Sequence, residues 1–218
     1  MKKSLLILGF PRTMSSFYAR SICLPALKDF KAHSEGSCEF LLERYGIQGG
    51  QNFVKEYERK HIYFNRLNKL SKEKKWLLKD VNNPFVCKDF IKENKDAFNV
   101  ILIRRNLVDV IFHIYKLGWF WPLNALIGVD KEIEEVIESI KSLRKKSKIG
   151  REFKPSPYHR KIVLPKLVRA ILHTDKYVYQ ELIGLENVIE VSYEKLIKNE
   201  NYYKEGLREF GYSLKENQ

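Results

Sequence analysis

Short apolar runs, separated by polar segments, recur along the chain and predict buried strands. The first is Ser4-Leu5-Leu6-Ile7-Leu8-Gly9-Phe10. Helical spacing of apolar positions fills most of the intervals between the runs. The predicted strands cover residues 4–10, 29–34, 76–79, 99–103 and 187–192. The predicted helices cover residues 15–28, 37–46, 51–73, 84–96, 107–117, 130–148, 161–184 and 201–210.

This alternation of strands and helices predicts an α/β fold with three layers, in which a parallel sheet carries helices on both faces. A chain of 218 residues with 44% hydrophobic residues can bury one such core. We therefore expect residues 1–218 to form a single domain. In sheets of this kind, ligands bind outside the carboxyl ends of the strands. The aromatic segment 115–128 is interpreted as core or lid packing, with the wall of an acceptor pocket as the alternative.

The turn after the first predicted strand combines the features of an anion-binding corner. Pro11-Arg12-Thr13-Met14-Ser15-Ser16 connects that strand to a helical segment that opens with Phe17. Backbone N–H groups at a helix start, hydroxyl groups and the Arg12 guanidinium all bind phosphate oxygens. The turn lacks the Gly-Lys-Ser/Thr of a nucleoside-triphosphate loop, so ATP is not the first ligand to expect. The alternative is a plain strand–helix turn with a good N-cap.

A second apolar run, 99–103, ends in Arg104-Arg105-Asn106-Leu107-Val108-Asp109-Val110. With both segments in view, the chain resembles the sulfotransferase superfamily, whose P-loop-like α/β enzymes use 3′-phosphoadenosine 5′-phosphosulfate (PAPS). In that family, a Pro-Lys/Arg-Ser/Thr-Gly-Ser/Thr-Ser/Thr turn binds the 5′-phosphosulfate, and an Arg after a later strand binds the 3′-phosphate. The donor-binding residues that the resemblance implies are Arg12, Thr13, Met14, Ser15, Ser16, Phe17, Arg105, His113 and Tyr193.

Two weaker matches occur in the same chain order. Trp76-Leu77-Leu78-Lys79-Asp80 is similar to the family's Trp-x-x-Lys-Asp/Ser-Pro element. Tyr193-Glu194-Lys195-Leu196 is similar to its Tyr-Glu-Asp-Leu element, in which the Tyr lies near the adenine. The four matches together span residues 4–212.

The chain departs from the family pattern at named positions. Met14 stands where the family usually has Gly, a position suited to close backbone approach or positive φ. His113 replaces a Ser that donates to the 3′-phosphate, although a His can also donate. Leu107 replaces a Pro, and the family's basic, glycine-containing loop after the last helix is missing. These departures bear on the affinity for PAPS more than on the fold.

The resemblance also implies catalytic candidates. Sulfuryl transfer puts charge on the bridging oxygen of the leaving 5′-phosphate, which Arg12 and Lys79 can neutralise. The alternative for Lys79 is a surface lysine at a strand end. The acceptor needs a base, and the end of the second predicted strand offers Glu35 as the first candidate and His33 as the second. The alternative for both is a helix cap or loop residue.

Composition limits the partners. The net charge of +13 indicates anionic partners or a very soluble surface. The basic stretch 144–169 is either a solvated face or a rim that attracts an acidic acceptor or the donor. No nucleic-acid recognition module is present, so no nucleic-acid partner is expected. Three cysteines without metal-ligand spacing fit a reducing compartment, and no metal is expected. No apolar run approaches 18 residues, so we expect a cytoplasmic protein without a membrane anchor.

The sequence thus predicts a PAPS-dependent sulfotransferase. It would transfer a sulfuryl group to a hydroxyl or amine of a glycan or small molecule and release 3′-phosphoadenosine 5′-phosphate (PAP). One alternative is a P-loop small-molecule kinase. Another is a nucleotide-binding protein of sulfotransferase fold without transfer activity. The sequence identifies neither the acceptor nor the oligomeric state.

Overall fold

One parallel sheet organises the part of the chain that the structure, a computed structural model, describes. That part comprises residues 3–11, 13–23, 26–27, 30–33, 65, 76–81, 84–118, 120–146, 156–157, 159–199, 201–212 and 214. The strands are β1 (Ser4–Gly9), β2 (Lys31–His33), β3 (Trp76–Asp80), β4 (Phe98–Arg104) and β5 (Val188–Ser192). Their order across the sheet is β2-β3-β1-β4-β5, and every pairing is parallel. The central position of β1 explains why all six of its residues are buried.

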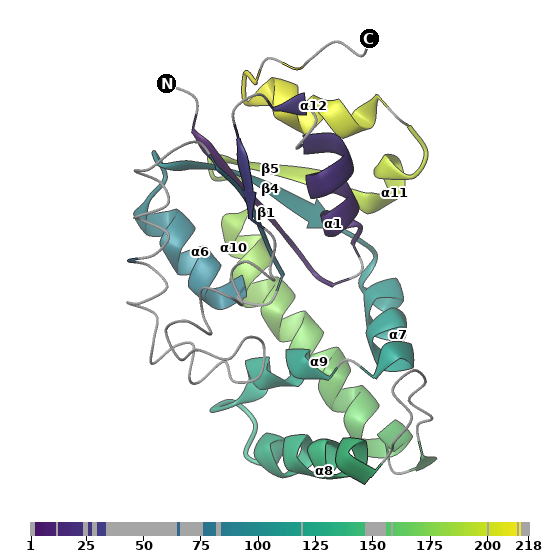
Figure 1. The fold of residues 1–218 in the computed structure, drawn as a ribbon. Helices are drawn as coiled ribbons and strands as arrows, with labels where there is room; N and C mark the ends of the chain where they lie inside the picture. The colour runs from purple at the N-terminus through teal and green to yellow at the C-terminus, as the bar shows by residue number, and fades with distance from the viewer. Residues whose placement is uncertain are drawn as a thin grey trace.

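Helical segments connect the strands (Figure 1). Those before β5 are α1 (Ser15–Phe17), the π-helix η1 (Tyr18–Cys23), α6 (Pro84–Glu93), α7 (Leu107–Leu117), the 3-10 helix η2 (Trp121–Leu126), α8 (Ile133–Lys146), the π-helix η3 (His159–Val163), α9 (Leu164–Thr174), the π-helix η4 (Asp175–Tyr179) and α10 (Gln180–Leu182). After β5 come α11 (Tyr193–Leu196) and α12 (Tyr202–Glu209).

The two faces of the sheet bury two separate apolar clusters. Leu5, Ile7 and Leu77 point to one face, where η1 and α12 pack against them. Leu6, Leu8 and their neighbours on β3 and β4 point to the other face, which α6, α9, η4 and α10 cover. Successive side chains of a strand alternate between faces, so each strand contributes to both clusters. The prediction of a three-layer α/β fold is confirmed.

The structure refines several predicted elements. The helix predicted over 161–184 runs through η3, α9, η4 and α10, with two π-helical turns that the apolar pattern did not indicate. The short helix α11 lies where the sequence predicted no helix. In the aromatic segment 115–128, Phe120, Leu123 and Leu126 are buried in the core, as expected of core packing. The helices predicted over 37–46 and 51–73 lie outside the described residues, apart from residue 65.

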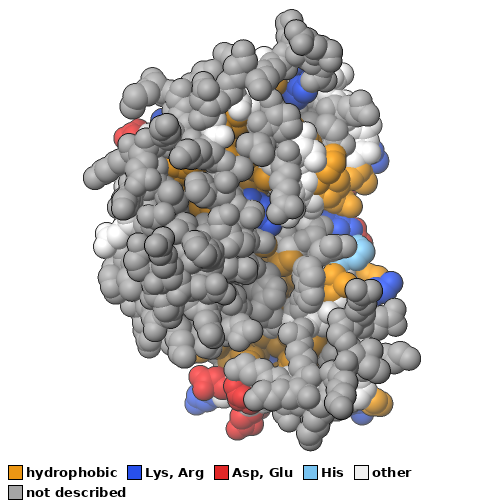
Figure 2. Space-filling view, in the orientation of Figure 1, with side chains coloured by type: hydrophobic (Ala, Val, Ile, Leu, Met, Phe, Trp, Pro, Cys, Tyr) orange, Lys and Arg blue, Asp and Glu red, His pale blue; other side chains and the backbone are white. Residues whose placement is uncertain are grey.

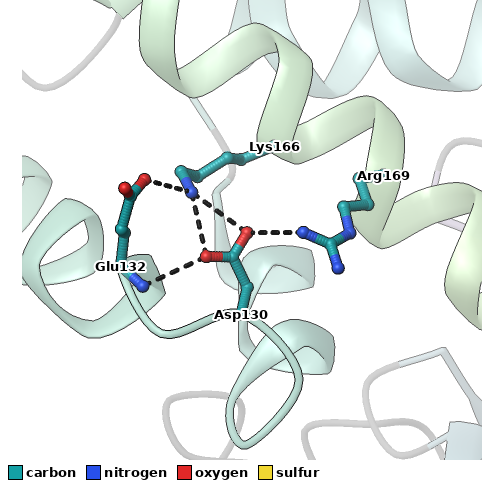
Figure 3. A network of polar contacts seen from close by, with 4 residues as sticks. All are labelled: Asp130, Glu132, Lys166 and Arg169. Atoms are coloured by element: carbon teal, nitrogen blue, oxygen red, sulfur yellow. Dashed lines mark hydrogen bonds and ion pairs between the residues drawn. The ribbon is translucent and has the colours of Figure 1, made fainter.

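Two cations of the basic stretch 144–169, Lys166 and Arg169, form ion pairs with carboxylates of the same chain. The Lys166 ammonium donates to both carboxylate oxygens of Asp130 at 3.0 Å and to Glu132 at 3.0 Å. Arg169 donates to Asp130 at 3.0 Å from one helical turn further along α9 (Figure 3). Asp130 therefore ties the segment between η2 and α8 to α9. These two cations are not available as a rim for an anionic substrate.

Replacing Asp130 by Asn should lower the stability near pH 7 by about 1–2 kcal/mol, because charge-assisted hydrogen bonds to a shielded carboxylate are lost. The hydrogen bond from Lys166 is the main reason that the pKa of Asp130 lies below its ordinary value. A carboxyl whose pKa is lowered by folding stabilises the protein above its unfolded pKa, and this contribution disappears as the pH falls through the folded pKa. Urea unfolding at pH 7 and near pH 3 should therefore show the Asn variant's deficit shrinking in acid. The control is Glu132→Gln, whose side chain is exposed and makes one of these contacts, and a deficit equal to that of Asp130→Asn would contradict the assignment.

Candidate functional site

The loop between β1 and α1 is folded tightly over the end of β4. A Cβ added to Gly9 would meet the backbone oxygen of Ile103 at 2.6 Å and the Thr13 hydroxyl at 3.0 Å, so only glycine fits there. The buried Thr13 hydroxyl donates to the Phe10 carbonyl at 2.8 Å. Met14 lies in the left-handed region with φ 59° and ψ 15°, a backbone conformation that glycine adopts easily.

Met14, in the left-handed conformation, is followed directly by the right-handed residues of α1. Such a left-handed residue next to right-handed ones forms a concave anion-binding nest. Ser15 is buried and Ser16 is exposed at this helix start. Anion binding by this loop, which lacks a Gly-Lys-Ser/Thr sequence, stays a prediction.

Replacing Gly9 by Ala should destabilise the protein by about 1–3 kcal/mol, because the new methyl group must displace the Ile103 carbonyl or the loop. The matched control is Gly206→Ala in α12, where the added Cβ would meet Val191 at an ordinary 3.4 Å. That change should be neutral or stabilise by up to about 1 kcal/mol, as glycine is a poor helix former. Urea unfolding of both variants checks this prediction. Equal stabilities would show that the loop adjusts freely over β4.

Lys79 brings a cation to the loop from the neighbouring strand. Its side chain leaves β3 on the same face as Leu77, and this is the face that η1 covers. It is buried, with 5% of its surface exposed, and its ammonium donates to the Ser16 hydroxyl at 3.0 Å. Lys79 is thus not the surface lysine of the alternative interpretation. Its ammonium group lies at the start of α1, at the carboxyl edge of the sheet.

Asp80 lies on the opposite face from Lys79. It follows Leu78 in the alternation, and Leu78 belongs to the cluster under α6 and η4. There Asp80 is buried close to Tyr179: burial raises the pKa of the Tyr179 phenol, and the nearby Cys87 and Asp80 raise it further. On β3, a cation and not a carboxylate therefore accompanies the loop.

Arg105 forms a second cationic point directly after β4, on the other side of β1 from Lys79. Its guanidinium lies over the Tyr193 ring with the guanidinium carbon 4.2 Å from the ring centroid, a cation–π arrangement. The same guanidinium is 3.7 Å from the carboxylate of Asp109, one turn into α7. β4 and β5 are paired through Arg104 and Ser192, which places Tyr193 beside Arg105. Two of the residues that the resemblance implied for the donor are thus in contact.

Glu194 joins the two strand ends around Arg105. Its carboxylate accepts the Asn106 backbone N–H at 2.9 Å and the Ser192 hydroxyl at 3.0 Å. Burial alone would raise the pKa of Glu194, but these hydrogen bonds and the charge of Arg105 together hold it below its ordinary value. Glu194 was not among the site residues predicted from the sequence. Its partner Asn106 is 88 positions away, so local patterns gave no signal.

Arg104 lies on the other face of β4 from this contact. Its guanidinium forms an ion pair with Asp175 of η4, which also accepts a hydrogen bond from Gln180 at 3.1 Å. Asp175 opens a wide π-helical turn, in which the Gln180 backbone N–H donates to the Asp175 carbonyl. This turn places the Asp175 side chain toward the sheet, where it is buried. The pair fixes the carboxyl end of β4 just before Arg105. No local pattern in the sequence indicated this ion pair, whose partners are 71 positions apart.

His113 and Phe17 lie at the margins of this edge. His113 is one helical turn beyond Asp109 on the same side of α7, half-buried, with its ring 6.0 Å from Phe112. Phe17 ends α1 and is 43% exposed. Figure 2 shows hydrophobic side chains over α11 and over α7, with Lys or Arg and His side chains between them. The exposed large hydrophobic residues on or directly after α1, α7 and α11 are Phe17, Val108, Phe112, Leu117 and Ile197.

The remaining candidates are only partly described. Arg12 and Glu35 lie outside the described residues, so their roles stay predictions. His33 ends β2, where its backbone pairs with Leu78, but its side chain is not described. Since β2 is parallel to β3, His33 lies at the same sheet edge as Lys79. Among the described residues, no group of three His, Cys, Asp or Glu side chains could hold a metal ion.

Comparison with known proteins gives matches only among solved structures. No protein-family model and no curated protein matches the chain. Of 22 matching chains, one is a shikimate kinase from Bacteroides thetaiotaomicron, with TM-score 0.48, 7% identity and 94% of each chain covered. Another is an uncharacterised protein from Eubacterium ventriosum, with TM-score 0.38, 12% identity, 91% of this chain covered and 97% of the other. Separately, no helix in the described part of the chain could span a membrane.

Proposed function

We propose that this protein is a transferase that binds a nucleotide at the carboxyl edge of its sheet and moves a sulfuryl group from PAPS to a hydroxyl or amine acceptor. The observation that carries the proposal is the pair of separate cationic points at the ends of β3 and β4, the two strands that flank β1. Lys79 lies at the start of α1, and Arg105 lies on Tyr193 after β4. A donor with a phosphosulfate at one end and a 3′-phosphate at the other needs two such points.

The orientation of β3 favours a donor that is neutralised by side-chain cations. In P-loop NTPases, Mg²⁺ is held by the loop Ser/Thr and by an Asp at the end of a nearby strand. Here Asp80 points to the other sheet face, and Lys79 contacts the loop serine. In the reaction, the acceptor oxygen or nitrogen attacks the sulfur while the bond from sulfur to the bridging phosphate oxygen breaks. Lys79 and Arg12 would neutralise the charge that collects on that oxygen, and PAP would leave.

The acceptor's proton must go to a base at this edge. Glu35 remains the first candidate and His33 the second, since β2 brings its carboxyl end to the same edge as Lys79. Substituting each in turn, Glu35→Gln and His33→Ala, separates them. The true base should lose turnover while PAPS binding stays nearly unchanged.

The second candidate function is phosphoryl transfer from ATP by a small-molecule kinase. Asp80 favours it by its place in the chain, at the end of the strand next to β1, although its side chain points to the sheet face opposite Lys79. This is the class of the shikimate kinase found among the solved structures. A donor-binding protein without transfer activity is the third hypothesis.

Thermal unfolding with separate additions of PAP, PAPS, ATP and Mg²⁺–ATP distinguishes these functions. A ligand at a hundred times its dissociation constant stabilises by about 2.7 kcal/mol. We expect PAP and PAPS to give this shift and Mg²⁺–ATP to give little. The opposite order would assign the protein to the kinases. If PAP binds, a screen of acceptors with labelled PAPS comes next, and a complete lack of transfer would favour the binding protein.

A further inference from the structure

We infer that Glu194 is a positioning residue that holds Arg105 in place for recognition of an anionic group. The inference rests on the proposed function, because the anion is taken to be the 3′-phosphate of the donor. Glu194 would not touch the donor itself. The affinity for the 3′-phosphate would nevertheless depend on the Glu194 carboxylate, because that carboxylate holds Arg105 in place.

The contacts of Glu194 link two helix starts. Asn106 caps α7, where its side-chain oxygen accepts the Val108 N–H at 2.9 Å. Ser192 caps α11, where its hydroxyl accepts the Lys195 N–H at 3.3 Å. The Glu194 carboxylate accepts hydrogen bonds from the Asn106 backbone and the Ser192 hydroxyl. One side chain therefore fixes both caps relative to each other.

Arg105 lies between these fixed points. Two consecutive residues after β4 contact two consecutive residues after β5. The Arg105 guanidinium lies on the Tyr193 ring, and the Asn106 backbone N–H donates to the Glu194 carboxylate. On the other side of β4, the pair formed by Arg104 and Asp175 anchors the preceding residue. With its backbone held on both sides and one face of its guanidinium on a ring, Arg105 presents its N–H edge in a restricted direction. This reduces the conformational entropy lost when an anion binds.

A direct electrostatic role of Glu194 predicts the opposite result. The pKa of Glu194 is below its ordinary value, so the side chain is anionic at neutral pH and would repel an approaching phosphate. If repulsion dominated, removing the charge would strengthen anion binding. If positioning dominates, removing the side chain weakens it, and a glutamine that keeps both hydrogen bonds restores it. Glutamine can do so because its oxygen accepts the Asn106 N–H and its NH₂ group donates to the Ser192 hydroxyl.

The experiment measures dissociation constants of PAP and of adenosine 5′-phosphosulfate, which lacks the 3′-phosphate, for wild type, Glu194→Ala and Glu194→Gln. We expect Glu194→Ala to lose about tenfold in PAP affinity with adenosine 5′-phosphosulfate unchanged, and Glu194→Gln to recover most of that loss. The matched control is Glu205→Ala on the exposed side of α12, which should leave the ratio of the two affinities unchanged. Equal losses for both ligands, or tighter PAP binding by both Glu194 variants, would overturn the inference.

A measurement without nucleotide separates this inference from the proposed function. In wild type, the Tyr193 ring should shift the NMR signals of the Arg105 side chain upfield. We expect Glu194→Ala to move them toward free-arginine values and Glu194→Gln to keep them shifted. Unchanged signals in Glu194→Ala would refute the positioning role. A wild-type protein that binds no PAP would refute the proposed donor, while the NMR result still decides the role of Glu194.

Discussion

Replacing Lys79 by Met should slow sulfuryl transfer by about 10²–10³-fold, because a preorganised donor to the developing charge is lost. Methionine keeps the length and most of the volume of the buried side chain, so the effect on packing is small. The ammonium already lies at the loop, held by Ser16 at 3.0 Å, and needs no rearrangement to act. The measurement is the rate of PAP formation from labelled PAPS with the acceptor that screening identifies.

Two further variants show whether the charge or the packing is responsible. Lys131→Met removes an equal charge from an exposed position and should leave the rate unchanged. Ser16→Ala removes the hydroxyl that orients the ammonium and should cost less than Lys79→Met does. A Lys79→Met enzyme within about threefold of wild type would show that this lysine only supports the loop. Arg12→Ala is expected to give a loss of the same size as Lys79→Met, on the basis of its place in the loop sequence.

Replacing Arg105 by Ala should weaken PAP binding by about 1.5–3 kcal/mol, roughly 10–150-fold, because a charge-assisted contact to the 3′-phosphate disappears. Adenosine 5′-phosphosulfate has no 3′-phosphate, so its affinity should change little. Calorimetric titration of both nucleotides gives the comparison. The difference between the two changes in binding free energy isolates the contact with the 3′-phosphate, because a general effect on the site would weaken both nucleotides equally.

The control for Arg105 is Lys116→Ala, which removes an exposed cation from the last turn of α7. Its effect on both nucleotides should be small and should decrease with added salt, since it acts only at long range. Parallel losses of PAP and adenosine 5′-phosphosulfate in Arg105→Ala would instead mean that Arg105 supports the Tyr193 ring and the strand ends. In that case the second phosphate must bind elsewhere.

The strands could be predicted from the sequence because burial on both sheet faces leaves continuous apolar runs. Residues 4–9 form such a run and are all buried in β1. The π-helical turn at Asp175–Tyr179 could not be predicted in this way. Its residues Asp175 and Tyr179 contact Arg104 and Phe10, which come from distant parts of the chain. The apolar positions around the turn keep the spacing of an ordinary helix, so the local sequence does not reveal it.

Features of the site could be predicted from the sequence where a position demands a particular backbone conformation, or where a residue lies at the end of a predicted strand. Met14 was identified as an unusual residue at a position suited to positive φ, and it adopts φ 59°. Lys79 and Arg105 both lie at strand ends, and the parallel sheet brings these to one edge. Glu194 and Asp175 escaped detection because their importance comes from partners 88 and 71 positions away.

The π-helical turn in the long helix also determines which sequence changes the protein can accept. A π turn holds one residue more than an α turn, so removing a single residue between Asp175 and Tyr179 would let the helix run on regularly. Because the extra residue is contained within this one turn, the segment beyond the deletion would keep its orientation toward the sheet, and Leu182 would stay in the core. The contacts inside the turn would change instead, above all the ion pair of Asp175 with Arg104. We therefore expect alignments of related chains to tolerate a one-residue gap between Asp175 and Tyr179, whereas a gap elsewhere in the helix would turn its apolar side away from the sheet.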